Sequence, residues 1–142
     1  MAASRSKYIF AGAAHHASSE GERYRGGLFR RSPGDGDWQS LTTGLPANVE
    51  ARAFAIDPRD SNVIYVGTQD GPYRSLDSGS RWERVAFPQR EVVIWSLAFD
   101  PADPKIMYAG SAPVGVYRSD EIEATYRFAV KDFTTTNMTP DE

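Results

Sequence analysis

The chain lacks cysteine and has little of what nucleic acid or membranes require. With no cysteine among its 142 residues, disulfides and thiolate chemistry are excluded. Acidic residues outnumber basic ones by 19 to 16, so the net charge of −3 supplies no basic field for nucleic acid or an anionic membrane. No apolar run approaches the roughly 20 residues that a spanning helix needs. We therefore expect a globular domain without cofactor, metal, nucleic acid or membrane partner.

The first residues have only a weak likeness to an export signal. The stretch "MAASRSKYIFAGAA" places two cations before a short apolar segment that Gly12 interrupts. This segment lies at the short limit for a signal peptide. We expect a cytoplasmic protein, although exported bacterial proteins can also lack cysteine.

The chain does contain an internal repeat. The segment "AFAIDPRDSNVIYVGTQDGPYRS" at 53–75 returns as "SLAFDPADPKIMYAGSAPVGVYRS" at 96–119, and a weaker copy starts near Tyr8. A period of about 44 residues is typical of propeller blades and of helical HEAT-type units. The residues within each copy decide between the two.

Each copy reads as short β runs separated by turn residues. In the second copy the runs are 52–56, 63–66, 72–74 and 82–85, with Asp-Pro, Asn and Asp-Gly between them. Only Ser119–Tyr126 has any helical character. Four short runs per copy predict a four-stranded antiparallel blade. We predict an all-β fold of three four-stranded blades in one propeller segment over 1–142, with blades at about 8–42, 51–86 and 94–130.

The stretch "SLDSGSRW" predicts a turn between the third and fourth strands. Short Ser75 and Asp77 side chains can accept hydrogen bonds from backbone N–H groups that lack ladder partners. Gly79 can adopt a positive φ, and Trp82 can bury its ring between blades. A catalytic or metal-binding role for Asp77 is the alternative. We prefer the structural interpretation, and extend it to the turns at Asp57-Pro58 and Asp100-Pro101, where two carboxylates per turn do not make a calcium site.

These residues resemble a known repeat. Ser75-x-Asp77-x-Gly79-x-x-Trp82 is similar to the Asp-box, or BNR repeat, of sialidases, xyloglucan-degrading enzymes and sortilin-type receptors. The resemblance covers two units well and the first poorly. It implies a β-propeller and says little about activity, since propellers host unrelated functions.

Antiparallel order divides the loops between two faces. The Asp-Pro turns and the turn between Ser75 and Trp82 share one face. The remaining loops share the other face, which carries the ligand site in propellers generally. The longest loop there, 13–26, holds both histidines, but it can equally be a solvated, mobile loop. Arg52 and Trp95 start equivalent inner strands and suit sugar stacking or carboxylate binding, unless they merely line the channel. The binding candidates are His15, His16, Glu22, Tyr24, Arg25, Arg52, Gln69, Asp70, Arg90, Glu91 and Trp95.

Three blades do not close a ring, because propellers typically use four to eight. We predict a homodimer with six blades in total, the number found in the sialidases that the repeat resembles. The tail 131–142 would complete the first blade of the partner by strand exchange. The alternatives are a fragment of a longer propeller and pairing with a different subunit.

The function predicted is a binding module for a glycan, a small molecule or a protein. The alternative is a sialidase-like glycoside hydrolase at the channel mouth of the dimer. It would need an arginine cluster, a tyrosine with a carboxylate and an acid–base carboxylate. The available residues are Tyr24, Arg25, Arg52 and Arg90, with Glu20, Glu22 and Glu91 nearby. A xyloglucanase-like enzyme would need two carboxylates across a cleft between propellers, which one short chain does not provide.

Overall fold

The computed structural model describes residues 7–14, 16–17, 23–24, 26–88, 91–112, 115–120 and 126–130, and within them every regular element is a β-strand. No helix long and apolar enough to cross a membrane occurs in these ranges. The all-β prediction is confirmed. The strands are β1 (Ile9–Ala13), β2 (His16–Ala17), β3 (Arg23–Tyr24), β4 (Gly27–Arg31), β5 (Gln39–Ser40), β6 (Ala53–Ile56), β7 (Ile64–Thr68), β8 (Gly71–Ser75), β9 (Glu83–Arg84), β10 (Val93–Phe99), β11 (Ile106–Ala112), β12 (Gly115–Asp120) and β13 (Tyr126–Val130).

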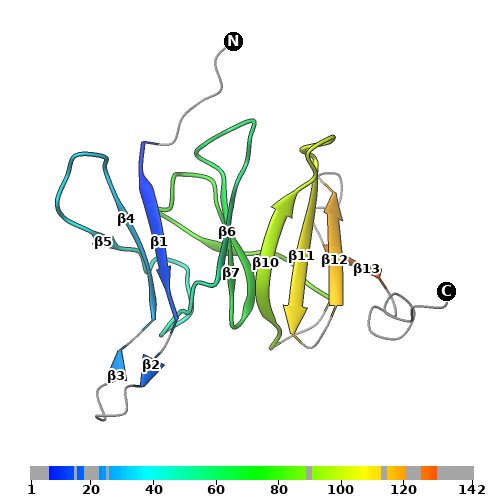
Figure 1. The fold of residues 1–142 in the computed structure, drawn as a ribbon, viewed down its shortest axis with the longest axis horizontal. Helices are drawn as coiled ribbons and strands as arrows, with labels where there is room; N and C mark the ends of the chain where they lie inside the picture. The colour runs from blue at the N-terminus through cyan, green and yellow to red at the C-terminus, as the bar shows by residue number, and fades with distance from the viewer. Residues whose placement is uncertain are drawn as a thin grey trace, which may run out of the picture.

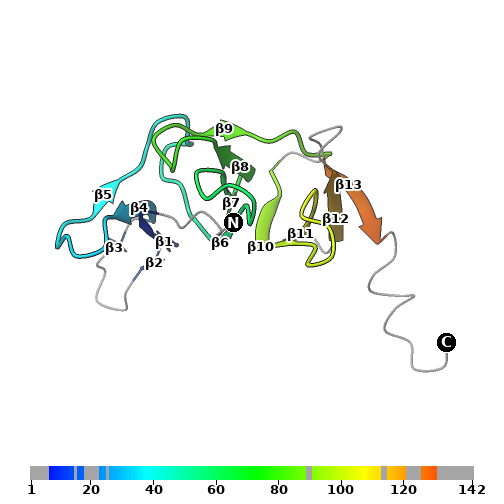
Figure 2. The same cartoon turned by 90° about the horizontal axis from the view of Figure 1, so that it is seen from above.

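The strands form three blade-like sheets that stand side by side (Figures 1 and 2). The second has the order β6-β7-β8-β9 and the third β10-β11-β12-β13, antiparallel throughout. The first has three described strands, β1-β4-β5, as expected for a copy whose first strand run is β1. In the described residues, the place that β6 and β10 occupy in the other sheets is empty beside β1. A hairpin of β2 and β3 extends from the first sheet.

Glycine at one repeat position lets neighbouring blades approach closely. A Cβ on Gly12 would lie 2.6 Å from Ala51 Cβ, and one on Gly67 would lie 2.7 Å from Ile94 Cγ2. In each case the atom met belongs to the segment at the start of the next blade. A side chain at either position would therefore force two blades apart.

The core lies between blades and not within them. One cluster joins the first and second sheets, and the other joins the second and third. Their buried members are Leu28, Leu41, Val49, Ala51, Ile64, Val66, Tyr73 and Trp82 in the first, and Ala55, Val85, Val92, Ile94, Met107, Ala109 and Tyr117 in the second. Each blade is thus stabilised by burying apolar area against its neighbours, as in other repeat proteins.

The strand directions place the loops on two opposite faces. In Figure 1, β10 and β12 run upward and β11 runs downward. The β10–β11 turn therefore lies at the upper end and the β11–β12 connection at the lower end. By the same order in the second sheet, the Asp57 and Asp77 turns lie at the upper end, and the β7–β8 turn lies at the lower end.

Candidate functional site

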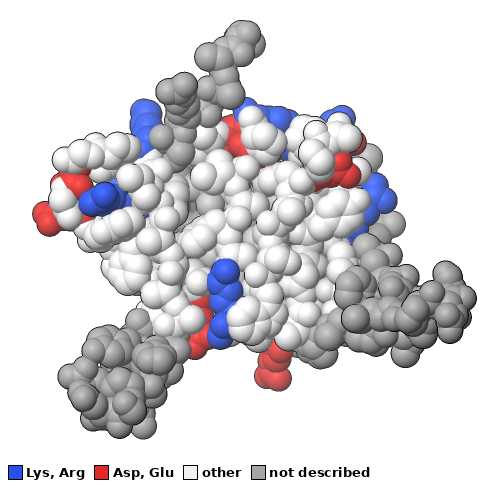
Figure 3. Space-filling model, viewed as in Figure 1, with Lys and Arg blue, Asp and Glu red and all other residues white. Residues whose placement is uncertain are grey.

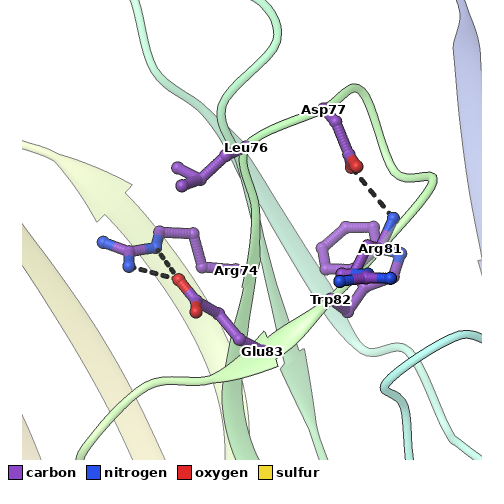
Figure 4. A pocket seen from close by; sticks show the side chains of 6 residues that line it. All are labelled: Arg74, Leu76, Asp77, Arg81, Trp82 and Glu83. Carbon is purple, nitrogen blue, oxygen red and sulfur yellow. Dashed lines mark hydrogen bonds and ion pairs between the residues drawn. The ribbon is translucent and has the colours of Figure 1, made fainter.

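The upper end of the second blade carries the serine–aspartate turn. Ser75 Oγ accepts from the Gly79 N–H at 2.8 Å and donates to Asp77 Oδ1, also at 2.8 Å. Asp77 Oδ1 also accepts from the Arg81 N–H at 2.9 Å (Figure 4). Trp82 Nε1 donates to the Gly79 carbonyl at 2.9 Å. Trp82 is buried in the first inter-blade cluster. The polar side chains of Ser75 and Asp77 therefore form hydrogen bonds within their own turn.

Two carboxylates of the upper end, Asp57 and Asp77, have lowered pKa values. The hydrogen bond from the Arg81 backbone N–H is the main cause that lowers the pKa of Asp77. Burial would raise the pKa of Asp57, but hydrogen bonds from the side chain and backbone of Arg59 outweigh it, and the pKa is lowered. A general acid requires the opposite shift. Among the described residues, no three His, Asp or Glu side chains gather closely enough to hold a metal ion.

A pocket of about 250 Å³ lies beside this turn. Figure 4 shows its lining, in which the Arg74 guanidinium is paired with the Glu83 carboxylate. The remaining wall is formed by Leu76, Asp77, Arg81 and Trp82. Because two of its charges neutralise each other and Asp77 serves the turn, the pocket offers few free polar groups to a ligand.

The lower end of the blades holds a different arrangement, built around Arg52 and Trp95. The guanidinium carbon of Arg52 lies 4.3 Å from the centroid of the Trp95 ring, a cation–π contact. Arg52 also pairs with the carboxylate of Glu50. The ring remains 54% exposed. The two residues come from adjacent blades, so the contact bridges the second and third sheets.

A β-bulge presents Trp95. The register of β10 against β11 shifts between Ile94 and Ser96, which leaves Trp95 outside the regular ladder. A bulge of this kind re-aims a side chain, and bulges are common beside binding sites. Ile94 is fully buried, so the strand stays anchored while its neighbour faces solvent.

Two further candidates tie this region together. The Oε1 atom of Gln69 accepts from the Glu50 N–H at 2.8 Å, and its Nε2 donates to the Asn48 carbonyl at 3.0 Å. Gln69 thereby fixes the segment that carries Glu50. Sequence reasoning missed Glu50, although it precedes Arg52 by two positions, and such residues share a side of an extended chain.

Asp70 is engaged elsewhere. It accepts a hydrogen bond from the Tyr73 hydroxyl at 2.9 Å, and Arg84 lies 3.7 Å away. Burial and the bond to Asp70 raise the pKa of Tyr73 to about 12, which keeps the phenol protonated as a donor. Glu91 is exposed and has a positive φ of 55°. The structure thus gathers Arg52, Trp95 and Gln69 around Glu50, while Asp70 belongs to a neighbouring pair.

The long loop is only partly described. His16 pairs with Tyr24 in the β2–β3 hairpin. The remaining candidates of the two polar loops, His15, Glu22, Arg25 and Arg90, lie outside the described residues, as does the tail 131–142. On the face drawn in Figure 3, charged side chains lie mainly toward the ends of the strands, and uncharged residues cover most of the middle.

Known proteins similar to this chain are propellers. No family model matches it. The xyloglucanase Xgh74A of Acetivibrio thermocellus is 36% identical over 59 residues, which is 39% of this chain and 7% of that enzyme. A GH74 enzyme from Niastella koreensis superposes with a TM-score of 0.66 and 18% identity, over 91% of this chain and 20% of the enzyme. The GH74 xyloglucanase of Xanthomonas campestris gives 0.58 and 19%, over 84% and 23%.

These likenesses establish the fold. The chain is built as part of a β-propeller, and it spans a small fraction of the proteins that it matches. At such low identity, the superpositions carry no information on activity.

Proposed function

We propose that this chain is an Asp-box propeller segment that binds a glycan at its lower face, through Trp95, Arg52 and Glu50. The observation that carries the proposal is the Arg52–Trp95 pair, in which a guanidinium lies 4.3 Å from a tryptophan ring that is 54% exposed. The Asp-box assignment is supported by the hydrogen bonds of Ser75 and Asp77 within their turn.

The chemistry of the pair suits a sugar. An exposed indole offers an apolar surface for the C–H face of a pyranose ring, and burying that surface is favourable. Arg52 and Glu50 provide a donor and an acceptor beside it for hydroxyl groups. Arg52 Nε is buried and has no hydrogen-bond partner among the described residues, so one donor remains to be satisfied. The similarity to xyloglucanases favours a β-glucan chain such as xyloglucan as ligand.

Binding is preferred to hydrolysis. A glycosidase needs a carboxylic acid with a raised pKa and a second carboxylate a few ångströms away. At the lower face, Glu50 is paired with Arg52, and Asp70 accepts from Tyr73. Among the described residues, the carboxylates with displaced pKa values are Asp57 and Asp77, whose pKa values are lowered and which lie at the opposite end. The sialidase-like alternative stays a prediction, because its candidates Arg25 and Glu22 lie outside the described residues.

The test is a titration of the full chain with xyloglucan oligosaccharides, followed by calorimetry. We expect Trp95→Ala to weaken binding by roughly tenfold or more, the size of a lost central aromatic contact. Leu76→Ala is the matched control, because Leu76 is 57% exposed at the upper end and should leave affinity unchanged. Undiminished binding by Trp95→Ala, or no binding across a panel of oligosaccharides, would overturn the proposal. Release of reducing ends in the same mixtures would show hydrolysis, and the hydrolase alternative would then replace the proposal of a binding module.

A further inference from the structure

The repeat allows one structural position to be compared in three blades. Ile9, Ile64 and Met107 each lie three residues before the repeat glycine, on the side of the blade that faces the preceding blade. Ile64 is 0% exposed and Met107 is 4% exposed, because a neighbouring blade covers them. Ile9 is 42% exposed. The first blade thus presents an apolar position that is buried in both other blades.

The tryptophans repeat the same contrast. Trp82 is 3% exposed, in the cluster between the first and second blades. Trp38, at the corresponding place one repeat earlier, is 44% exposed and has the Arg31 guanidinium 5.1 Å above its ring. Ile9 and Trp38 therefore mark an uncovered flank of the first blade, which we call the leading flank. β1 also has an unpaired edge there among the described strands.

The third blade carries the complementary surface. Phe10 and Tyr65, each two residues before the repeat glycine, face the following blade and pack against the first and second clusters, respectively. Tyr65 makes an edge-on contact with Phe99 of the third blade, with ring centroids 5.9 Å apart. Tyr108 holds the same position in the third blade, where none of the described strands follows it. Tyr108 with Gly110 forms what we call the trailing flank.

We infer that a second copy of this chain covers these flanks, with the trailing flank of each copy on the leading flank of the other. The occupant of the leading flank must resemble a blade surface of the kind that Phe10 and Tyr65 provide, and Tyr108 provides it. Such a contact continues the two inter-blade interfaces already present within the chain. It is head-to-tail, and made twice it closes a ring with two-fold symmetry.

Two copies also fit the number of blades in a closed propeller. Two copies of three blades make six, within the usual range of four to eight, whereas three copies would make nine. Closure by two copies would also cover the exposed leading flank, of a kind that soluble proteins rarely leave uncovered. This inference is independent of the proposed glycan site.

Light scattering of the full chain tests the inference. At micromolar concentration we expect twice the 15.7 kDa of one chain. Ile9→Glu places a charge in the new interface and should yield a single chain, with dimerisation weakened by roughly a hundredfold. Ile56→Glu is the matched control, because Ile56 is also 42% exposed but lies on neither flank. That variant should remain dimeric.

Three results would contradict the inference of a closed dimer. A wild-type mass of one chain, a mass that grows without limit, or equal loss of dimer in both variants would each overturn the inference. Far-UV circular dichroism shows whether Ile9→Glu is folded. Trp38 gives a second readout, since its burial should shift tryptophan emission to shorter wavelength on association. Trp38→Ala should abolish that shift and weaken the dimer.

Discussion

At the scale of single residues, glycines show how much of the turn between Ser75 and Trp82 depends on backbone conformation. Gly79 has φ +94°, and a Cβ there would lie 2.9 Å from Phe10 Cε1 and 3.1 Å from Leu41 Cδ1. Both a strained backbone and a crowded inter-blade space therefore favour glycine. Gly34 has φ +84° but open space around it, and Gly36 has open space without a positive φ. Comparing Gly79, Gly34 and Gly36 therefore separates the effect of backbone strain from the effect of close neighbouring atoms.

We predict a graded loss of stability in three alanine variants. Gly36→Ala should change the free energy of unfolding by less than about 0.5 kcal/mol, as expected for surface changes. Gly34→Ala should lose about 1–2 kcal/mol through left-handed strain alone. Gly79→Ala should lose about 2–5 kcal/mol, because overpacking adds to the strain. Urea unfolding at one fixed protein concentration measures all three, and equal losses at Gly34 and Gly79 would show that crowding contributes nothing.

At the scale of elements, the two equivalent tryptophans separate packing within the chain from packing between chains. We expect Trp82→Ala to lower the free energy of unfolding by about 3–5 kcal/mol, because a large buried ring is lost between two blades. Trp38→Ala should cost about 1 kcal/mol or less, since the ring is 44% exposed. Both substitutions should be made on the Ile9→Glu background, which keeps the chain single. Comparable losses at the two positions would contradict this assignment of flanks.

Local residue patterns predict the strands well, because each is bounded by turn residues that the sequence displays. The run 63–66 anticipates β7 at Ile64–Thr68, and Tyr126–Val130 is β13. The β2–β3 hairpin was missed, since the polar loop 13–26 has no alternation of apolar residues. The bulge at Trp95 leaves no mark in the sequence either. It depends on register, which tertiary packing sets.

The candidate site shows the same limit. The repeat predicts that Arg52 and Trp95 lie at equivalent positions of two blades and therefore on one face. It does not predict that they touch, because the distance between blades is a property of the assembled sheets. The hydrogen bond from the Glu50 N–H to Gln69 was likewise not predicted from the sequence. The sequence pattern of one repeat therefore does not predict which side chains contact each other across two blades.

At the scale of the whole molecule, stability is a sum of blade interfaces, because each blade touches only its neighbours. The described structure contains two such interfaces, and the first and third sheets each have a neighbouring described sheet on one side only. Association of two copies would add two interfaces of the same kind. Anything that binds only the folded chain stabilises it by mass action.

The melting temperature of the wild-type chain should therefore rise with protein concentration. A tenfold increase stabilises the dimer by about 1.4 kcal/mol, which corresponds to a shift on the order of 2 °C when two chains of this size unfold together. Ile9→Glu should melt at one temperature across the same range, because its leading flank no longer docks. Ile56→Glu should retain the wild-type slope, since the exposed side chain at that position lies away from both flanks. Scanning calorimetry over two decades of concentration measures this dependence, and a flat wild-type curve would mean that the three blades are stable without a partner.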